Sequence, residues 1–152
     1  GKFYKYEDEV YFKNFVLEHD LSDFVEYYGV VSGVSKCMLL EKCNVFILLT
    51  NYPNEGQPIS IIEAMGNGML IITTNHAGIP DLISSDNGLL INKKLIDLEY
   101  IYSYLIELLS NKEVIKRIGL ENYRHVRKKY TEKDYVKGME EVFEILLDRK
   151  DI

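Results

Sequence analysis

Two glutamates, Glu55 and Glu63, are the side chains of this sequence best suited to binding a polar ligand. Seven residues separate them, and the first of these are Gly56-Gln57-Pro58. One carboxylate can accept hydrogen bonds from both members of a pair of neighbouring hydroxyl groups, which is a strong, charge-assisted arrangement. The spacing therefore favours a ligand that carries hydroxyl groups at two separate places.

The residues between the two glutamates suit an anion. Pro58 predicts the start of a helix, because proline is well tolerated in the first helical turn. The backbone N–H groups of Ile59 and Ser60 then have no partner within the helix and can bind phosphate. Gly56 lets the backbone come close to a ligand. A nucleotide-sugar, with an anionic middle and hydroxyl-bearing ends, has the shape that this segment favours.

Simpler interpretations exist for these and other candidates. Taken alone, Glu55 is compatible with an ordinary loop carboxylate, and Glu63 with a solvated helical residue. Histidine side chains can act as acid or base, but His76 is a lone histidine and lacks the orienting partner expected of a catalytic base. Cys37 and Cys43 have neither zinc nor redox spacing, so we expect two buried, reduced thiols. No cluster of residues predicts a metal site.

Helix and strand patterns alternate along the chain. The patterns predict strands at 25–28, 45–49, 69–74 and 89–91, helices at 7–18, 35–42 and 58–65, a helical turn at 79–83, and three further helices after Asp97, Asn111 and Thr131. Strands separated by helices pair in parallel through right-handed crossovers. We therefore expect a doubly wound α/β sheet, with Glu55 in a loop beyond the carboxyl end of a buried strand, where such sheets bind ligands.

Length and charge narrow the class of protein. The chain has 152 residues, which predicts a single domain over 1–152. The formal net charge of −6 argues against a nucleic-acid surface. The longest apolar run, 45–49, is far shorter than the roughly 20 residues of a membrane span, so no transmembrane segment is predicted. The composition and the free thiols favour the cytoplasm.

The segment 55–68, EGQPISIIEAMGNG, resembles the signature of glycosyltransferase family 4, whose members have the GT-B fold. The resemblance extends to VEYYGVV, KCMLLEKCNVFILLT, MLIITTNHAGIPDLI, NGLLI and TEKDYVKGMEEVFEILL, so it covers nearly the whole chain. Departures are small: Gly66 stands where the family usually has alanine, and Asp81 where glutamate is commoner.

The resemblance implies a role for each site residue. Glu55 would hold hydroxyls of the transferred sugar, in a positioning and electrostatic role, and Glu63 would hold the ribose hydroxyls. The backbone near Gly56, at Gln57, Ile59 and Ser60, would face the sugar and the diphosphate. Val31 would pack on the nucleobase and Lys36 would lie near its edge. Plain core packing for Val31 and a surface charge for Lys36 remain as alternatives.

For the whole protein, the resemblance implies the C-terminal, donor-binding domain of a retaining hexosyltransferase, cut from a two-domain enzyme. The donor would be a UDP-, GDP- or ADP-sugar, and the acceptor a glycan or lipid-linked molecule in polysaccharide or cell-surface glycan synthesis. The acceptor-binding N-terminal domain would be absent here, together with an upstream Arg and Lys for the diphosphate, leaving this fragment inactive. Peripheral contact with the inner face of the plasma membrane is compatible with that role.

Two other functions fit the same sequence. A non-catalytic module that binds a nucleotide or phospho-ligand on a flavodoxin-like sheet explains the buried strands equally well, but not the two glutamates at this spacing. A degenerate glycosyltransferase domain that serves only as a scaffold is the third interpretation, and the intact glutamate pair argues against it.

Overall fold

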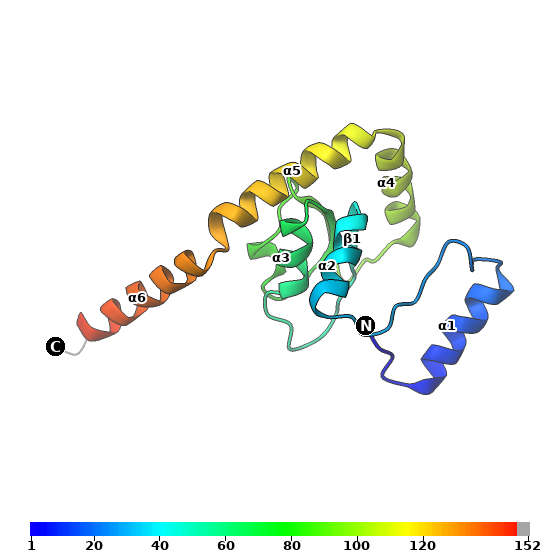
Figure 1. Ribbon diagram of the computed structural model, residues 1–152, viewed down its shortest axis with the longest axis horizontal. Coiled ribbons are helices and arrows are strands. Elements are labelled where there is room, and N and C mark those ends of the chain that lie inside the picture. The colour runs from blue at the N-terminus through cyan, green and yellow to red at the C-terminus, as the bar shows by residue number, and fades with distance from the viewer. Residues whose placement is uncertain (149–152) are drawn as a thin grey trace. The chain divides into compact units, whose positions relative to one another are not determined.

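The computed structural model of the protein describes residues 1–148, and the chain forms two compact units, Gly1–Leu39 and Leu40–Ile152 (Figure 1). The elements in chain order are α1 (Tyr6–Glu18), α2 (Gly33–Lys42), β1 (Val45–Leu48), α3 (Ile59–Gly66), β2 (Leu70–Asn75), a 3₁₀ turn η1 (Ile79–Asp81), β3 (Gly88–Asn92), α4 (Leu98–Ser110), α5 (Lys112–Lys129) and α6 (Glu132–Asp148).

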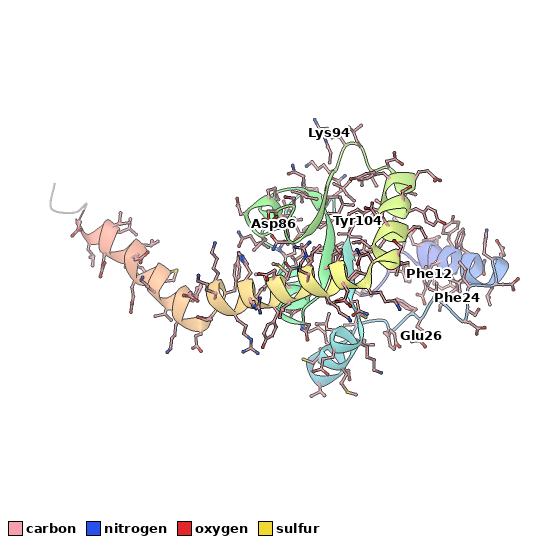
Figure 2. All side chains as sticks on the ribbon, turned by 90° about the horizontal axis from the view of Figure 1, so that it is seen from above. Phe12, Phe24, Glu26, Asp86, Lys94 and Tyr104 are labelled. Carbon is pink, nitrogen blue, oxygen red and sulfur yellow. The ribbon has the colours of Figure 1, made fainter. Side chains whose placement is uncertain are left out.

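The first unit is built on aromatic contacts. Phe3, Phe12 on α1 and Tyr27 form a cluster in which ring centroids lie 5.2–6.0 Å apart; Figure 2 labels Phe12. The predicted strand at 25–28 is wrong, because those residues are irregular. A strand needs a hydrogen-bonded neighbour. This segment is held by other contacts, including a hydrogen bond from the Tyr27 hydroxyl to the Gly1 carbonyl (3.1 Å).

The second unit contains a three-stranded parallel sheet in the order β1-β2-β3. The register pairs Val45 with Leu70 and Ile71 with Gly88. In the central strand β2 only the last residue, Asn75, is exposed. This pattern is typical of a strand covered on both faces, and it explains why β2 is a continuous apolar run.

Helices cover both faces of this sheet. On one face Ile71 packs with Ile61 and Met65 of α3. On the other face Leu70 and Ile72 pack with residues of α4 and α5. Figure 1 shows α5 running from α4 toward α3, so one long helix contributes to both cores. The predicted doubly wound α/β arrangement is therefore confirmed.

The cysteine prediction is half correct. Cys37 and Cys43 are free thiols, but both are exposed rather than buried. Cys37 is exposed because α2 has no fully buried residue; the α2 side chain that packs against the core of the second unit is Leu40, which is only partly buried. Cys43 lies in the short connection between α2 and β1.

Membrane-spanning helices and metal-binding clusters are both absent from residues 1–148. No helix in this range combines the length and the apolar character that a membrane crossing requires. The same residues contain no group of three or more His, Cys, Asp or Glu side chains that could hold a metal ion.

Thr131 caps α6, as predicted, and does so reciprocally with Asp134. The Asp134 N–H donates to Thr131 Oγ1 (3.2 Å), and the Thr131 hydroxyl donates to Asp134 Oδ2 (2.6 Å). The Thr131 side chain and backbone hydrogen bonds lower the pKa of Asp134. A carboxylate with a lowered folded pKa stabilises the helix above its unfolded pKa of roughly 3.9, and this contribution is lost as the pH falls through the folded pKa.

We therefore expect the first turn of α6 to fray on acidification below about pH 4. The measurement is the amide NMR signals of residues 132–136 between pH 2 and 6. The Asp134→Asn variant is the control, because it cannot titrate and should lack this transition. An identical transition in both proteins would contradict the role given to Asp134.

Candidate functional site

Three loops meet at the carboxyl edge of the sheet in the second unit. They follow Leu48 at the end of β1, Asn75 at the end of β2 and Asn92 at the end of β3. Because the strands are parallel and paired in register, their carboxyl ends lie at the same edge. This is where open α/β sheets bind ligands.

Glu55 lies in the first of these loops, residues 49–57, called the Glu55 loop below. Its side chain is half-buried, and its Oε2 accepts a hydrogen bond from the Thr50 hydroxyl (3.0 Å). The Thr50 carbonyl in turn accepts from the Thr74 hydroxyl of β2 (2.5 Å). The sheet therefore orients the carboxylate. An ionised carboxylate offers about four acceptor positions, so this bond leaves capacity for ligand hydroxyls.

The turn between Glu55 and α3 packs closely on the second loop. A Cβ atom added at Gly78 would lie 3.1 Å from both the Gly56 carbonyl oxygen and the Gln57 Cγ. The absence of a side chain at Gly78 therefore allows the two loops to approach. Pro58 is buried as the N-cap residue of α3, and its carbonyl accepts from the Ile61 N–H (3.0 Å).

The first turn of α3 is open to solvent. Ile59 is 71% exposed, although Ile61 two residues later is fully buried. Ser60 is exposed as well. Glu63, half-buried, lies four residues after Ile59 and so projects from the same side of the helix. The backbone N–H groups in this exposed first turn can bind the phosphate group of a ligand.

The predicted site residues divide between the two units. Six of them form one continuous stretch of the second unit, from the Glu55 loop into α3: Glu55, Gly56, Gln57, Ile59, Ser60 and Glu63. Val31 and Lys36 belong to the first unit, and their contacts with a nucleobase stay predictions.

Sequence reasoning missed the partners of His76. This residue is buried, with 8% of its surface exposed. Its Nε2 lies 2.6 Å from the Tyr52 carbonyl oxygen, in the Glu55 loop. Its Nδ1 lies 2.6 Å from the Nζ of Lys93, in the loop after β3. His76 thus joins all three loops. No sequence signal indicates this, because Lys93 is 17 residues away.

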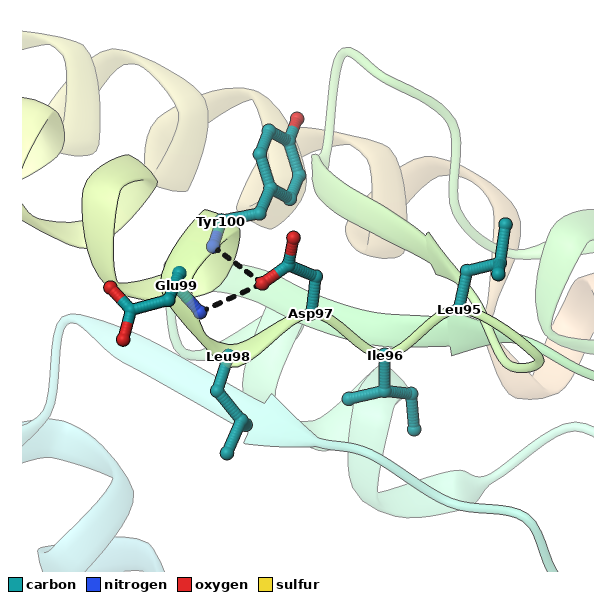
Figure 3. Close-up of a pocket in the computed structure, with 6 residues that line it drawn as sticks. All are labelled: Leu95, Ile96, Asp97, Leu98, Glu99 and Tyr100. Carbon is teal, nitrogen blue, oxygen red and sulfur yellow. Dashed lines mark hydrogen bonds between the residues drawn. The ribbon is translucent and has the colours of Figure 1, made fainter.

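A depression elsewhere on the second unit is lined by six consecutive residues, Leu95 to Tyr100 (Figure 3). Asp97, within this run, caps α4. One oxygen of Asp97 accepts hydrogen bonds from the N–H groups of Glu99 (3.0 Å) and Tyr100 (3.2 Å), which confirms the predicted cap of α4. The Asp97 carboxylate therefore has a structural role at the start of α4.

Solved structures show the class of fold. The chain superposes with a TM-score of 0.74 on the Anabaena protein HepE, solved in complex with UDP-glucose, at 16% sequence identity. The match covers 95% of this chain and 38% of the Anabaena chain. The fold is therefore that of GT-B glycosyltransferases.

The sequence model of the family "Glycosyl transferases group 1" matches residues 5–133. The chain belongs to this family. It is 29% identical over 149 residues to an uncharacterized glycosyltransferase of Methanocaldococcus jannaschii, which covers 97% of this chain and 39% of the relative. A putative colanic acid biosynthesis glycosyltransferase of Escherichia coli is 30% identical over 80 residues, or 50% of this chain and 20% of the relative. The chain thus spans well under half the length of these relatives.

Proposed function

We propose that this chain is the donor-binding domain of a retaining, family 4 glycosyltransferase that transfers a hexose from a nucleotide-diphosphate sugar. The observation that carries the proposal is the continuous segment from Glu55 to Glu63. It places three features together at the carboxyl edge of the sheet: a carboxylate oriented by Thr50, an exposed turn at Gly56-Gln57, and an exposed helix N-terminus.

Each part of the segment has a function in this proposal. Glu55 accepts hydrogen bonds from hydroxyls of the transferred sugar and stabilises positive charge at its anomeric carbon, without acting as a nucleophile. The N–H groups of Ile59 and Ser60 bind the diphosphate. Glu63 accepts both ribose hydroxyls. Val31 and Lys36 contact the nucleobase.

The relatives support a first choice of donor and of pathway for this proposal. UDP-glucose is the first donor to test, because the Anabaena protein was solved in complex with it; GDP- and ADP-sugars come next. The colanic acid relative supports a role in polysaccharide synthesis, with a glycan or lipid-linked acceptor. The proposed place of action is the cytoplasm, at the inner face of the plasma membrane. The acceptor would bind outside this chain, so the chain alone is expected to bind donor weakly without transferring sugar.

Substitution of Glu63 by alanine is expected to weaken nucleotide binding by about 10- to 100-fold, because it removes a pair of charge-assisted hydrogen bonds worth roughly 1.5–3 kcal/mol. The measurement is ligand-observed NMR with UDP, GDP, ADP and their common sugars against this chain. Saturation transfer to ribose and base protons should be seen for one nucleotide and lost in the variant.

The matched control is Glu140→Ala, which removes an exposed glutamate from α6. It should bind like the unmodified chain. Equal binding by Glu63→Ala would exclude the ribose contact. The non-catalytic module makes a different prediction at Glu55. If sugar protons receive no saturation, and Glu55→Gln binds UDP-glucose as well as the unmodified chain does, the nucleotide-module interpretation replaces the glycosyltransferase one.

A further inference from the structure

His76 has two partners that fix the protonation state of its ring. The Tyr52 carbonyl oxygen near Nε2 can only accept a hydrogen bond, so Nε2 must carry a proton. The Lys93 ammonium near Nδ1 can only donate, so Nδ1 must present its lone pair. Both partners therefore select the same neutral tautomer, protonated at Nε2. An imidazolium ring would place an N–H group against the Lys93 ammonium.

The oxygen that His76 holds also closes the turn that carries Glu55. The Tyr52 carbonyl accepts from the backbone N–H of Glu55 (3.1 Å) as well as from His76. The Tyr52 N–H donates to the Thr50 hydroxyl oxygen (3.2 Å), and that hydroxyl donates to the Glu55 carboxylate. The ring thus acts on a turn whose backbone and side-chain bonds converge on Glu55.

The ring reaches this turn from a rigid support. His76 directly follows β2, the central strand, which has a paired strand on each side. The His76 side chain is buried. Lys93 is half-buried in the loop after β3. The Glu55 loop by contrast contains four consecutive exposed residues, 51–54. A long exposed loop needs such external bonds to hold one conformation.

We propose that His76, oriented by Lys93, is a positioning residue that holds the Glu55 loop in its ligand-binding conformation. The loop in this conformation is expected to add affinity for the sugar part of the donor. This statement about the sugar rests on the function proposed above. Lys93 acts through the ring and His76 acts through the Tyr52 carbonyl. Neither residue touches the donor.

The first test needs no ligand. Long-range ¹H–¹⁵N correlation NMR of the imidazole rings at pH 7 should show the His76 ring protonated at Nε2 and bare at Nδ1. The His76→Gln variant assigns the signals against those of His19 and His125. Lys93→Met keeps the Tyr52 carbonyl at Nε2, so the tautomer should persist, but loss of the donor should shift the Nδ1 signal of His76 and the amide signals of residues 52–55. Lys94→Met, at the exposed neighbouring lysine labelled in Figure 2, should change neither.

The second test separates positioning from general packing. His76→Leu keeps a similar volume without hydrogen bonds, and should weaken UDP-glucose binding about 10-fold while UDP binding stays within about 2-fold. His76→Gln can donate to Tyr52 and accept from Lys93, so it should restore most of the affinity. The affinity of Lys93→Met for UDP-glucose should lie between those of His76→Leu and His76→Gln.

Several outcomes would overturn the proposal. A ring protonated at Nδ1, unchanged amide signals in Lys93→Met, or equal losses for UDP and UDP-glucose would each do so. If His76→Leu does not fold, His76→Gln and Lys93→Met decide the matter. If no nucleotide binds even the unmodified chain, the proposed function fails, while the tautomer and amide measurements still decide whether His76 positions the loop.

Discussion

Replacement of Asn122 by alanine is expected to lower the free energy of unfolding by about 3–5 kcal/mol, which is large for a single substitution. Asn122 lies on α5 and is completely buried. Its amide nitrogen donates to the carbonyls of Met69 (2.8 Å) and Asn87 (2.9 Å), and its oxygen accepts from the Asn87 side chain (2.8 Å). One side chain therefore ties α5 to the segments that enter β2 and β3.

The loss has two parts. Truncation leaves the Asn87 amide without its acceptor, and an unsatisfied buried polar group costs roughly 1–3 kcal/mol. It also leaves a cavity where the rest of the side chain was. Urea denaturation of the chain, followed by circular dichroism, measures the sum. Asn67→Ala is the matched control, because the Asn67 side chain also donates to a carbonyl (2.8 Å) but is exposed. This substitution should lower the free energy of unfolding by less than about 0.5 kcal/mol.

A second variant separates hydrogen bonding from packing. Asn122→Asp preserves the volume of the side chain but replaces the donating amide by a carboxylate, which would face the two backbone carbonyls. At neutral pH it should destabilise the chain at least as much as alanine does, because the buried charge would keep only the Asn87 amide as a donor while its other oxygen faces two carbonyls. A carboxylate variant as stable as the unmodified chain would show that the contacts of Asn122 contribute little.

Asn122 also shows where sequence reasoning ends. Apolar spacing along α5 indicates a buried stripe of Ile115, Ile118, Tyr123 and Val126. The two isoleucines are buried, but Tyr123 is 38% exposed and the buried position beside it is Asn122. A periodicity of apolar residues cannot find a buried asparagine, because its burial depends on partners 35 and 53 residues away in the sequence.

The three strands of the sheet, unlike the buried Asn122, have a signal that is local in the sequence. β1, β2 and β3 are largely apolar runs next to turn signals, so each could be recognised from its local composition. The run at 25–28 has the same local character, yet no strand forms there. β propensity expresses only how well side chains suit a pleated surface, and the backbone still needs a neighbouring strand.

The candidate site was predictable in part. The segment from Glu55 to Glu63 is continuous in the sequence, so its spacing and its Pro58 helix start could be recognised there. The contacts that orient it come from elsewhere: from Thr74 within β2, from His76 directly after β2, and from Lys93 after β3. Such contacts depend on strand order and register, which a single sequence does not specify.

Gly119→Ala is expected to destabilise the chain by about 2–3 kcal/mol or more, although alanine is the better helix former. Gly119 lies inside α5. A Cβ atom there would lie 2.0 Å from the carbonyl oxygen of Gly68 and 3.0 Å from its carbonyl carbon. Gly68 itself has φ +74°, a conformation that favours glycine, so the turn between α3 and β2 cannot easily move away.

Gly66→Ala is the matched control and has the opposite expected sign. This glycine ends α3, and an added Cβ would lie 3.5 Å from Val126 Cγ1, an ordinary van der Waals contact. The variant should gain roughly 0.5–1 kcal/mol from helix propensity. Urea denaturation of both variants gives the comparison. Because the two substitutions add the same methyl group to helical glycines, a loss at Gly119 with a gain at Gly66 isolates the close approach of α5 to the α3–β2 turn. Equal stability of the two variants would mean that this approach is not required for folding.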